Sequence, residues 1–192
     1  MSQIKLICAL GNPGDQYAQT RHNAGFWFLG KLCSSENVSL SLNSRFKGLV
    51  GDYRHSGQVI RLIAPQTYMN KSGEALVPFA KFYQAEPDEI LVVHDEIDLP
   101  PGSMKLKIGG GHGGHNGLRD IINLLGSKDF HRLRVGVGHP GEKSKVVSFV
   151  LNRPSSAEEQ LIDAGLDHAL AVLPQILAGE FSQAMNTLHS KS

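Results

Sequence analysis

The hydrophobic positions of this chain predict strands that alternate with helices. Residues 4–10 and 90–94 are almost continuously apolar, which is typical of strands covered on both faces of a sheet. Residues 104–108 alternate between apolar and polar, as in a half-exposed strand. Shorter apolar stretches predict further strands at 46–53, 58–64 and 132–137, the first two joined as a hairpin at 55–57.

Apolar residues at helical spacing predict the helices. One begins at His22 or Asn23, with Asn23 a possible N-cap, and ends at Leu32. The others cover residues 72–83, 118–125, 144–151 and 155–189, the last starting near Ser155 or Ser156. We therefore expect an α/β fold: a single layered domain of residues 1–192 with a central mixed sheet flanked by helices.

Composition and charge narrow the class of protein. The chain has 192 residues, 41% of them hydrophobic and 19% charged, which is usual for a globular protein, and it has no apolar run long enough to cross a membrane. Its start does not read as a signal peptide, and its two cysteines read as core residues, so we expect a cytoplasmic protein. The net charge of +1 restricts any nucleic-acid contact to a local patch.

Polar residues follow three of the predicted strands. Asn12 lies in a turn of Gly, Asn and Pro, a composition that turn formation alone would also explain, while Asn70 and Asp95 occupy similar places after later strands. The carboxyl ends of strands in an open α/β sheet are the usual location of ligand sites, so these residues can converge with His22. Imidazole can accept a proton near pH 7, a carboxylate can fix its tautomer, and amides can hold water or an oxyanion. This set predicts hydrolysis of an activated ester.

The glycine-rich segment 109–117 admits three explanations. A nucleotide phosphate loop is disfavoured because the Gly-x-x-x-x-Gly-Lys-Ser/Thr spacing is missing. A metal site is disfavoured because the candidate ligands have no known zinc spacing; they are His112 and His115 with His94 or His139 and Asp95. We prefer a substrate rim whose bare backbone lets a sugar or peptide approach Asn116, while a structural glycine loop remains open.

Basic residues gather late in the chain. Lys105 and Lys107 share one face of the predicted strand 104–108 because side chains on a strand repeat every two residues. Arg132, Arg134, Lys143 and Lys145 follow. This group is either a phosphate-binding patch or a solvated face, since lysines on edge strands also discourage aggregation. Salt dependence of binding would distinguish the two.

Five segments of the chain form a set of motifs. The two longest are Tyr-Ala-Gln-Thr-Arg-His-Asn-Ala-Gly-Phe at 17–26 and Gly-Gly-His-Gly-Gly-His-Asn-Gly at 110–117. The other three are Leu-Gly-Asn-Pro-Gly at 10–14, Thr-Tyr-Met-Asn at 67–70 and the segment from His94 to Pro100. In their residues, order and spacing these segments resemble the bacterial peptidyl-tRNA hydrolase family over essentially the whole chain, and the two longest look like the family signatures.

The resemblance implies a monomeric enzyme without metal or cofactor that hydrolyses the ester between a peptide and the 3′ end of tRNA. It implies that His22 is the general base and Asp95 its orienting partner. The residues it places around water, peptide or sugar are Asn12, Tyr17, Met69, Asn70, His115 and Asn116. Those it places on the tRNA 5′ phosphate are Lys105, Lys107 and Arg134. The alternative is a noncatalytic RNA-binding protein of the same fold.

Overall fold

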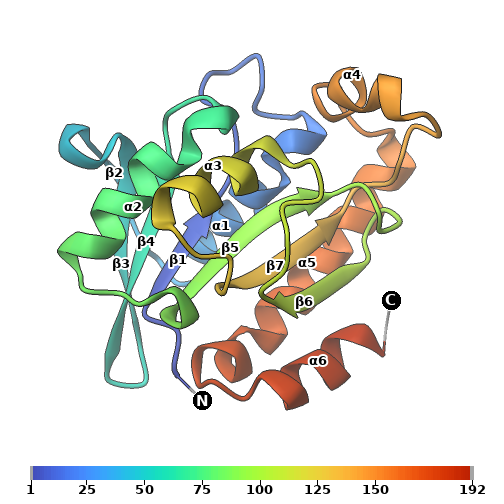
Figure 1. The fold of residues 1–192 in the computed structure, drawn as a ribbon. Coiled ribbons are helices and arrows are strands. Elements are labelled where there is room, and N and C mark those ends of the chain that lie inside the picture. Colours follow the sequence, from blue (N-terminus) through green and yellow to red (C-terminus); the bar gives the residue numbers. More distant parts are fainter. Residues whose placement is uncertain (1, 191–192) are drawn as a thin grey trace.

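A seven-stranded mixed sheet forms the centre of the molecule and confirms the predicted α/β fold (Figure 1). The computed structural model describes residues 2–190. The strand order is β2-β3-β4-β1-β5-β7-β6, with β4, β1, β5 and β7 parallel; β3 runs antiparallel to β2 and β4, and β6 to β7. The bounds are β1 (Leu6–Ala9), β2 (Ser41–Asn43), β3 (Gly48–His55), β4 (Gln58–Pro65), β5 (Ile90–Glu96), β6 (Met104–Ile108) and β7 (His131–Gly136).

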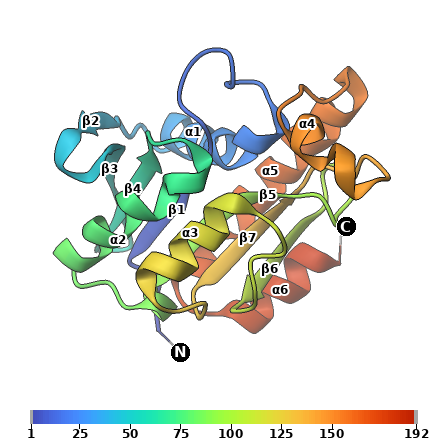
Figure 2. The same cartoon turned by 45° about the horizontal axis from the view of Figure 1, so that its top comes forward.

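Helices cover both faces of the sheet (Figures 1 and 2). On one face lie α2 (Ser72–Phe82) and α3 (Asn116–Leu125), and on the other α1 (Ala24–Ser35), α5 (Ser156–Leu177) and α6 (Phe181–His189). Leu6 and Cys8 of β1 pack in the first layer, and Ile7 and Ala9 in the second. Both faces of β1 are therefore buried, which explains its continuous apolar sequence.

Short helical turns follow the carboxyl ends of the parallel strands. The turn η1 (Arg21–Asn23) leads from the loop after β1 into α1, and η3 (Met69–Lys71) leads from β4 into α2. Beyond β7, η5 (Lys143–Lys145) and α4 (Val146–Val150) stand out from the sheet and its two helical layers (Figures 1 and 2). The loops that carry the predicted site residues thus meet at one edge of the sheet.

The structure differs from the prediction in three places. The helical pattern of 155–189 is two helices, because the chain turns at Gly179 with φ +82°, a conformation that glycine adopts easily. Strand β2 was not predicted. Asn23 makes no N-cap hydrogen bond; its side chain binds the backbone of the first loop instead. Within the described residues, no helix combines the length and apolar character needed to span a membrane.

Candidate active site

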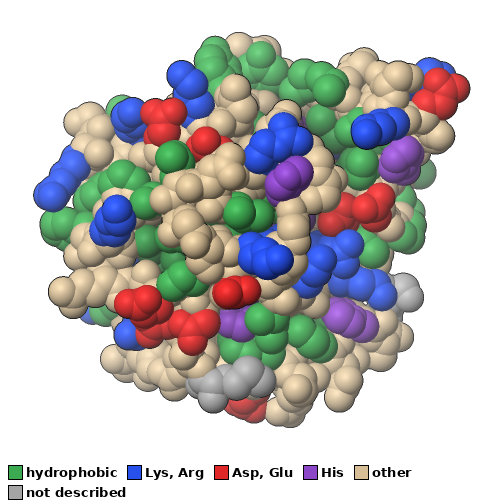
Figure 3. All heavy atoms as spheres, in the orientation of Figure 1, with side chains coloured by type: hydrophobic (Ala, Val, Ile, Leu, Met, Phe, Trp, Pro, Cys, Tyr) green, Lys and Arg blue, Asp and Glu red, His purple; other side chains and the backbone are tan. Residues whose placement is uncertain are grey.

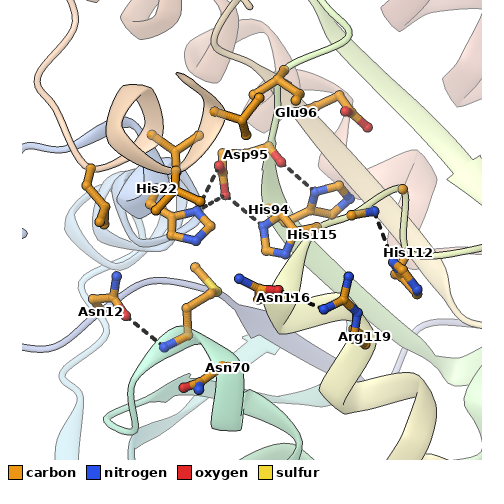
Figure 4. A pocket seen from close by; sticks show the side chains of 18 of the residues that line it. Asn12, His22, Asn70, His94, Asp95, Glu96, His112, His115, Asn116 and Arg119 are labelled. Atoms are coloured by element: carbon orange, nitrogen blue, oxygen red, sulfur yellow. Dashed lines mark hydrogen bonds and ion pairs between the residues drawn. The ribbon is translucent and has the colours of Figure 1, made fainter. Parts of the chain in front are cut away.

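A cavity of about 870 Å³ opens at the carboxyl edge of the sheet (Figure 4). Strand β5, the loops after β1 and β4, the glycine-rich segment and α4 all contribute to its lining. Seven predicted site residues lie in that lining, although they are far apart in sequence: Asn12, His22, Met69, Asn70, Asp95, His115 and Asn116. The structure therefore brings together the polar groups that the sequence placed after three different strands.

Asp95 contacts residues from the helical layers on both faces of the sheet. It precedes the last residue of β5 and is 3% exposed. His22 Nδ1 lies 3.0 and 2.9 Å from its two carboxylate oxygens, and His115 Nε2 lies 2.8 Å from Oδ1. His22 comes from the turn before α1 and His115 from the start of α3, so one buried carboxylate accepts from both helical layers. Such a carboxylate has little freedom to move.

The hydrogen bonds of His115 determine which of its nitrogens bears the proton. Its Nδ1 accepts from the backbone N–H groups of Gly117 and Leu118, at 3.1 and 3.3 Å, and so caps the first turn of α3. A ring nitrogen can accept a hydrogen bond only when it carries no proton, so Nδ1 is unprotonated. The ring proton is therefore on Nε2, which donates to Asp95. The tautomer of His115 is thus fixed by the backbone of α3.

The same carboxylate orients His22. Burial alone would lower the pKa of His22, but the charge and hydrogen bond of Asp95 outweigh it, so this pKa is raised from its ordinary value. Burial would raise the pKa of Asp95, yet the two histidines hold it well below its usual range. An ionised Asp95 accepts the Nδ1–H of His22 and leaves Nε2, with its lone pair, on the cavity side (Figure 4). This is the arrangement that a general base needs.

Asn12 links two loops of the site. Its Oδ1 accepts the backbone N–H of Met69 at 2.7 Å, which leaves its Nδ2 as a donor on the side of His22 (Figure 4). The side chain of Asn23, 1% exposed, holds the backbone of Asn12 through reciprocal bonds of 2.8 and 3.0 Å. Sequence reasoning missed this role of Asn23; its place beside His22 in the signature was the available signal. Asn23 therefore fixes the loop that presents an amide donor to the cavity.

Two glycines allow the close approach of helices at the site. A Cβ on Gly25 would lie 2.5 Å from the backbone oxygen of Val93 and 2.6 Å from that of Leu10, so α1 can approach the sheet here only with glycine. A Cβ on Gly117 would lie 2.6 Å from the sulfur of Met69. Sequence reasoning read these glycines as parts of the motifs. The structure gives Gly25 a steric role, since a larger residue would meet backbone and displace the turn of His22, whereas a larger residue at Gly117 would require the Met69 side chain to shift.

The remaining predicted substrate residues occupy different depths. Met69 lines the cavity but is only 4% exposed, whereas Asn70 and Asn116 are exposed at the cavity. Arg119 donates to Asn116 Oδ1 at 3.2 Å and so orients that amide. Tyr17 lies outside the cavity lining; its ring is nearly perpendicular to that of Tyr68, which does line the cavity, with centroids 6.3 Å apart.

The residues predicted to bind the 5′ phosphate lie beside the cavity, on β6 and β7, whereas Lys143 and Lys145 of the predicted basic group lie in η5, where Lys143 lines the cavity. Figure 3 shows basic side chains gathered over this part of the sheet, next to acidic ones. Lys105 is the register partner of Arg134, so the two share a face, and Lys107 is exposed on the same face. Arg134 Nε donates to Glu96, which lines the cavity, at 2.9 Å. We define Lys105, Lys107 and Arg134 as the basic strip.

Arg132 does not belong to the basic strip, contrary to the sequence interpretation. It is 2% exposed and lies beneath the glycine-rich segment. Its guanidinium donates to the carbonyl oxygens of Gly110, Gly111 and Lys128. A buried guanidinium bound to three carbonyls is an anchor for the loop and not a contact for a nucleic acid.

The hydrogen bonds also bear on the phosphate-loop and metal explanations. A phosphate loop offers backbone N–H groups to its ligand, but the two N–H groups at the start of α3 already donate to His115.

The potential ligand atoms of His22, Asp95 and His115 lie within 4.8 Å of one another, but His115 Nε2 holds a proton where a metal needs a lone pair. His94 is buried, and its Nδ1 contacts the Asp95 carbonyl oxygen. Burial lowers the pKa of His94 to about 3, with a smaller contribution from the charge of His115. The geometry fits a hydrogen-bonded site better than a metal centre.

Known proteins are similar to this chain in sequence and in structure. The family model described as peptidyl-tRNA hydrolase matches residues 6–192. Peptidyl-tRNA hydrolases of Pseudomonas savastanoi pv. phaseolicola and Pseudomonas fluorescens are each 55% identical over 192 residues, which is 100% of this chain and 99% of theirs. The crystal structure of peptidyl-tRNA hydrolase from Acinetobacter baumannii superposes with a TM-score of 0.95 at 50% identity, covering 98% of this chain and 96% of that one. The chain therefore belongs to the peptidyl-tRNA hydrolase family.

Proposed function

We propose that the protein hydrolyses the ester that joins a peptide, or an N-acyl-aminoacyl group, to the 3′ end of tRNA, and so returns tRNA from stalled translation. The observation that supports this most directly is the His22–Asp95–His115 arrangement at the wall of the cavity. It prepares a neutral imidazole to deprotonate water. Family membership supports the choice of substrate.

In the proposed mechanism His22 Nε2 removes a proton from a water molecule as the water oxygen attacks the ester carbonyl carbon. The carbonyl electrons move to oxygen, the side-chain amides of Asn12, Asn70 and Asn116 position the water, and their N–H groups donate to the oxyanion. The tetrahedral intermediate collapses, the carbon–oxygen bond to the ribose breaks, and protonated His22 returns its proton to the leaving 3′ oxygen. Asp95 stabilises the imidazolium throughout.

The rate enhancement expected from these groups is sufficient for hydrolysis of an ester. General-base assistance contributes about 10²- to 10⁴-fold and one oxyanion donor about 10²- to 10³-fold. The leaving group is an alkoxide on a ribose that also bears a neighbouring hydroxyl, and it departs more easily than the amine of an amide. The enzyme can therefore act on the ester while the peptide bonds of its substrate remain intact.

A paired assay tests the proposed function. The purified protein is expected to release the acyl group from N-acetyl-aminoacyl-tRNA much faster than from the same tRNA bearing a free amino acid, because only the acylated substrate resembles a peptide at the cavity. Release is measured as acid-soluble radioactivity. Binding of both substrates without release would instead identify the noncatalytic RNA-binding alternative.

The basic strip is proposed to hold the 5′ phosphate of the tRNA acceptor end. Replacing Lys105 and Arg134 together by alanine should weaken tRNA binding and reduce the slope of log K against log salt by about 1 to 2, since each phosphate contact releases about one counterion. Filter binding over a range of salt concentrations measures the slope. Arg54→Ala with Lys81→Ala removes the same charge from β3 and α2, at the other end of the sheet, and should leave the slope unchanged. Equal slopes in all three proteins would contradict the proposal.

A further inference from the structure

Arg21, the residue before His22, connects η1 to α4 and to the residues directly after α4. Its side chain is buried, and Nη1 donates to the backbone oxygens of Phe149, at 2.9 Å, and Asn152, at 3.3 Å. The guanidinium carbon lies 3.8 Å from the centroid of the Phe149 ring. The backbone N–H of Arg21 also donates to the oxygen of Asn152 at 3.0 Å. One residue thus binds this segment through its side chain and its backbone.

Glu158 completes this connection. Its Oε1 lies 3.3 Å from Arg21 Nη2 and also accepts the backbone N–H of Ser155 at 2.9 Å. The Ser155 hydroxyl accepts in return from the backbone N–H of Glu158, which makes a capping box at the start of α5. The positive charge of Arg21 is therefore balanced by a carboxylate that is itself fixed. Through these contacts Arg21 joins η1, α4 and α5.

Helix α4 presents an apolar wall to the cavity. Four lining residues form it: Val146, Val147, Val150 and Leu151. Val147 is 67% exposed and Leu151 38% exposed, although both are apolar. We call these four residues the α4 wall. Because α4 stands outside the sheet and its helical layers, its position depends on tethers such as Arg21 (Figures 1 and 2).

The chemistry of the α4 wall selects the part of the substrate that would contact it. Phosphate and ribose are polar and gain nothing from valine and leucine side chains, whereas an apolar amino-acid side chain gains by leaving water. The basic strip lies on β6 and β7, so the polar RNA has a separate surface. The wall is therefore suited to the acyl portion of the substrate.

We propose that Arg21 is a positioning residue that holds the α4 wall at a fixed place relative to His22, and that this wall binds the side chain of the esterified amino acid. The proposal rests on the proposed function and deepens it. Among the described contacts, those of the Arg21 side chain go to α4, the following segment and α5, and not to Asp95. Arg21 is thus expected to govern binding of apolar acyl groups and not proton transfer.

Kinetics of Arg21→Gln with two substrates test this role. The KM for N-acetyl-leucyl-tRNA should rise about tenfold, the KM for N-acetyl-glycyl-tRNA by no more than about twofold, and kcat for both should change by less than about threefold. The pH profile should not move. Arg153→Gln is the matched control: it removes the same charge from the same segment at a side chain that is 62% exposed, and should leave both substrates unaffected. Equal losses for the two substrates, or a fall in kcat alone, would overturn the proposal.

Two further measurements separate the tether from folding and from activity. Val147→Ser changes an exposed residue of the α4 wall and should reduce the preference for the leucyl substrate about threefold; together with Arg21→Gln its effect should be less than multiplicative. Hydrogen exchange without substrate should show amides of residues 146–152 exchanging about tenfold faster in Arg21→Gln than in the unmodified protein. Unchanged exchange would refute the tether even if no ester were cleaved, whereas faster exchange in a protein without esterase activity would refute only the proposed function.

Discussion

Replacing His22 by alanine should lower kcat for N-acetyl-aminoacyl-tRNA by about 10²- to 10⁴-fold, the usual contribution of a general base. Asp95 binds His22 Nδ1, and among the described residues no hydrogen-bond partner occupies Nε2 at the cavity, so the substitution removes the proposed proton acceptor. Substrate affinity should change little, since Asn70, Asn116 and the basic strip remain. Single-turnover release of the acyl group measures the effect.

His55→Ala provides a control for this substitution. His55 ends β3, away from the cavity, and its Nδ1 contacts the hydroxyl of Tyr53 at 3.2 Å. Its replacement should leave turnover as it is. Thermal unfolding of both variants shows whether the fold is retained. Full turnover by a folded His22→Ala protein would remove His22 from the mechanism and with it the proposed path of the proton.

Asp95→Asn should lower the rate by about 10⁴-fold, the loss that follows the analogous change in serine proteases, where the histidine takes the wrong tautomer. The reason can be read from His115. Its Nδ1 is committed to the start of α3, so its Nε2–H keeps the only carbonyl oxygen of the new amide. The NH₂ group then faces His22 Nδ1, which must accept instead of donate. The proton moves to Nε2, and His22 can no longer deprotonate water.

NMR of the His22 ring tests this explanation independently of turnover. In the unmodified protein the ring should hold its proton on Nδ1 and titrate with a pKa above the ordinary value, because Asp95 stabilises the charged form. In Asp95→Asn the proton should be on Nε2 and the pKa should fall, since burial remains while the carboxylate charge is lost. An unchanged tautomer together with a large loss of rate would show that Asp95 acts in another way.

The chain sequence was sufficient to predict much of the fold and to name residues that the structure brings together at one cavity. Continuous apolar runs identified the buried strands β1 and β5, because burial on both faces is recorded locally in the composition of a strand. Asn12 and Asn70 follow strands and Asp95 lies at the end of one, and this predicted their convergence, since parallel strands end at one edge. The division of the last helical region at Gly179 was not predicted, because glycine also occurs within helical patterns.

What the sequence by itself determined is the α/β class, the edge of the sheet that bears the candidate site, and the residue types available there for ester hydrolysis. Tertiary structure alone decided that Asp95 serves two histidines, that His115 has its proton on Nε2, that Arg132 is buried and that Arg21 binds the segment after α4. The physical reason is the sequence separation over which each feature is determined. Strand and helix patterns depend on neighbouring residues, whereas His22 and Asp95 are 73 positions apart, and the partner of each polar group depends on how closely the layers pack.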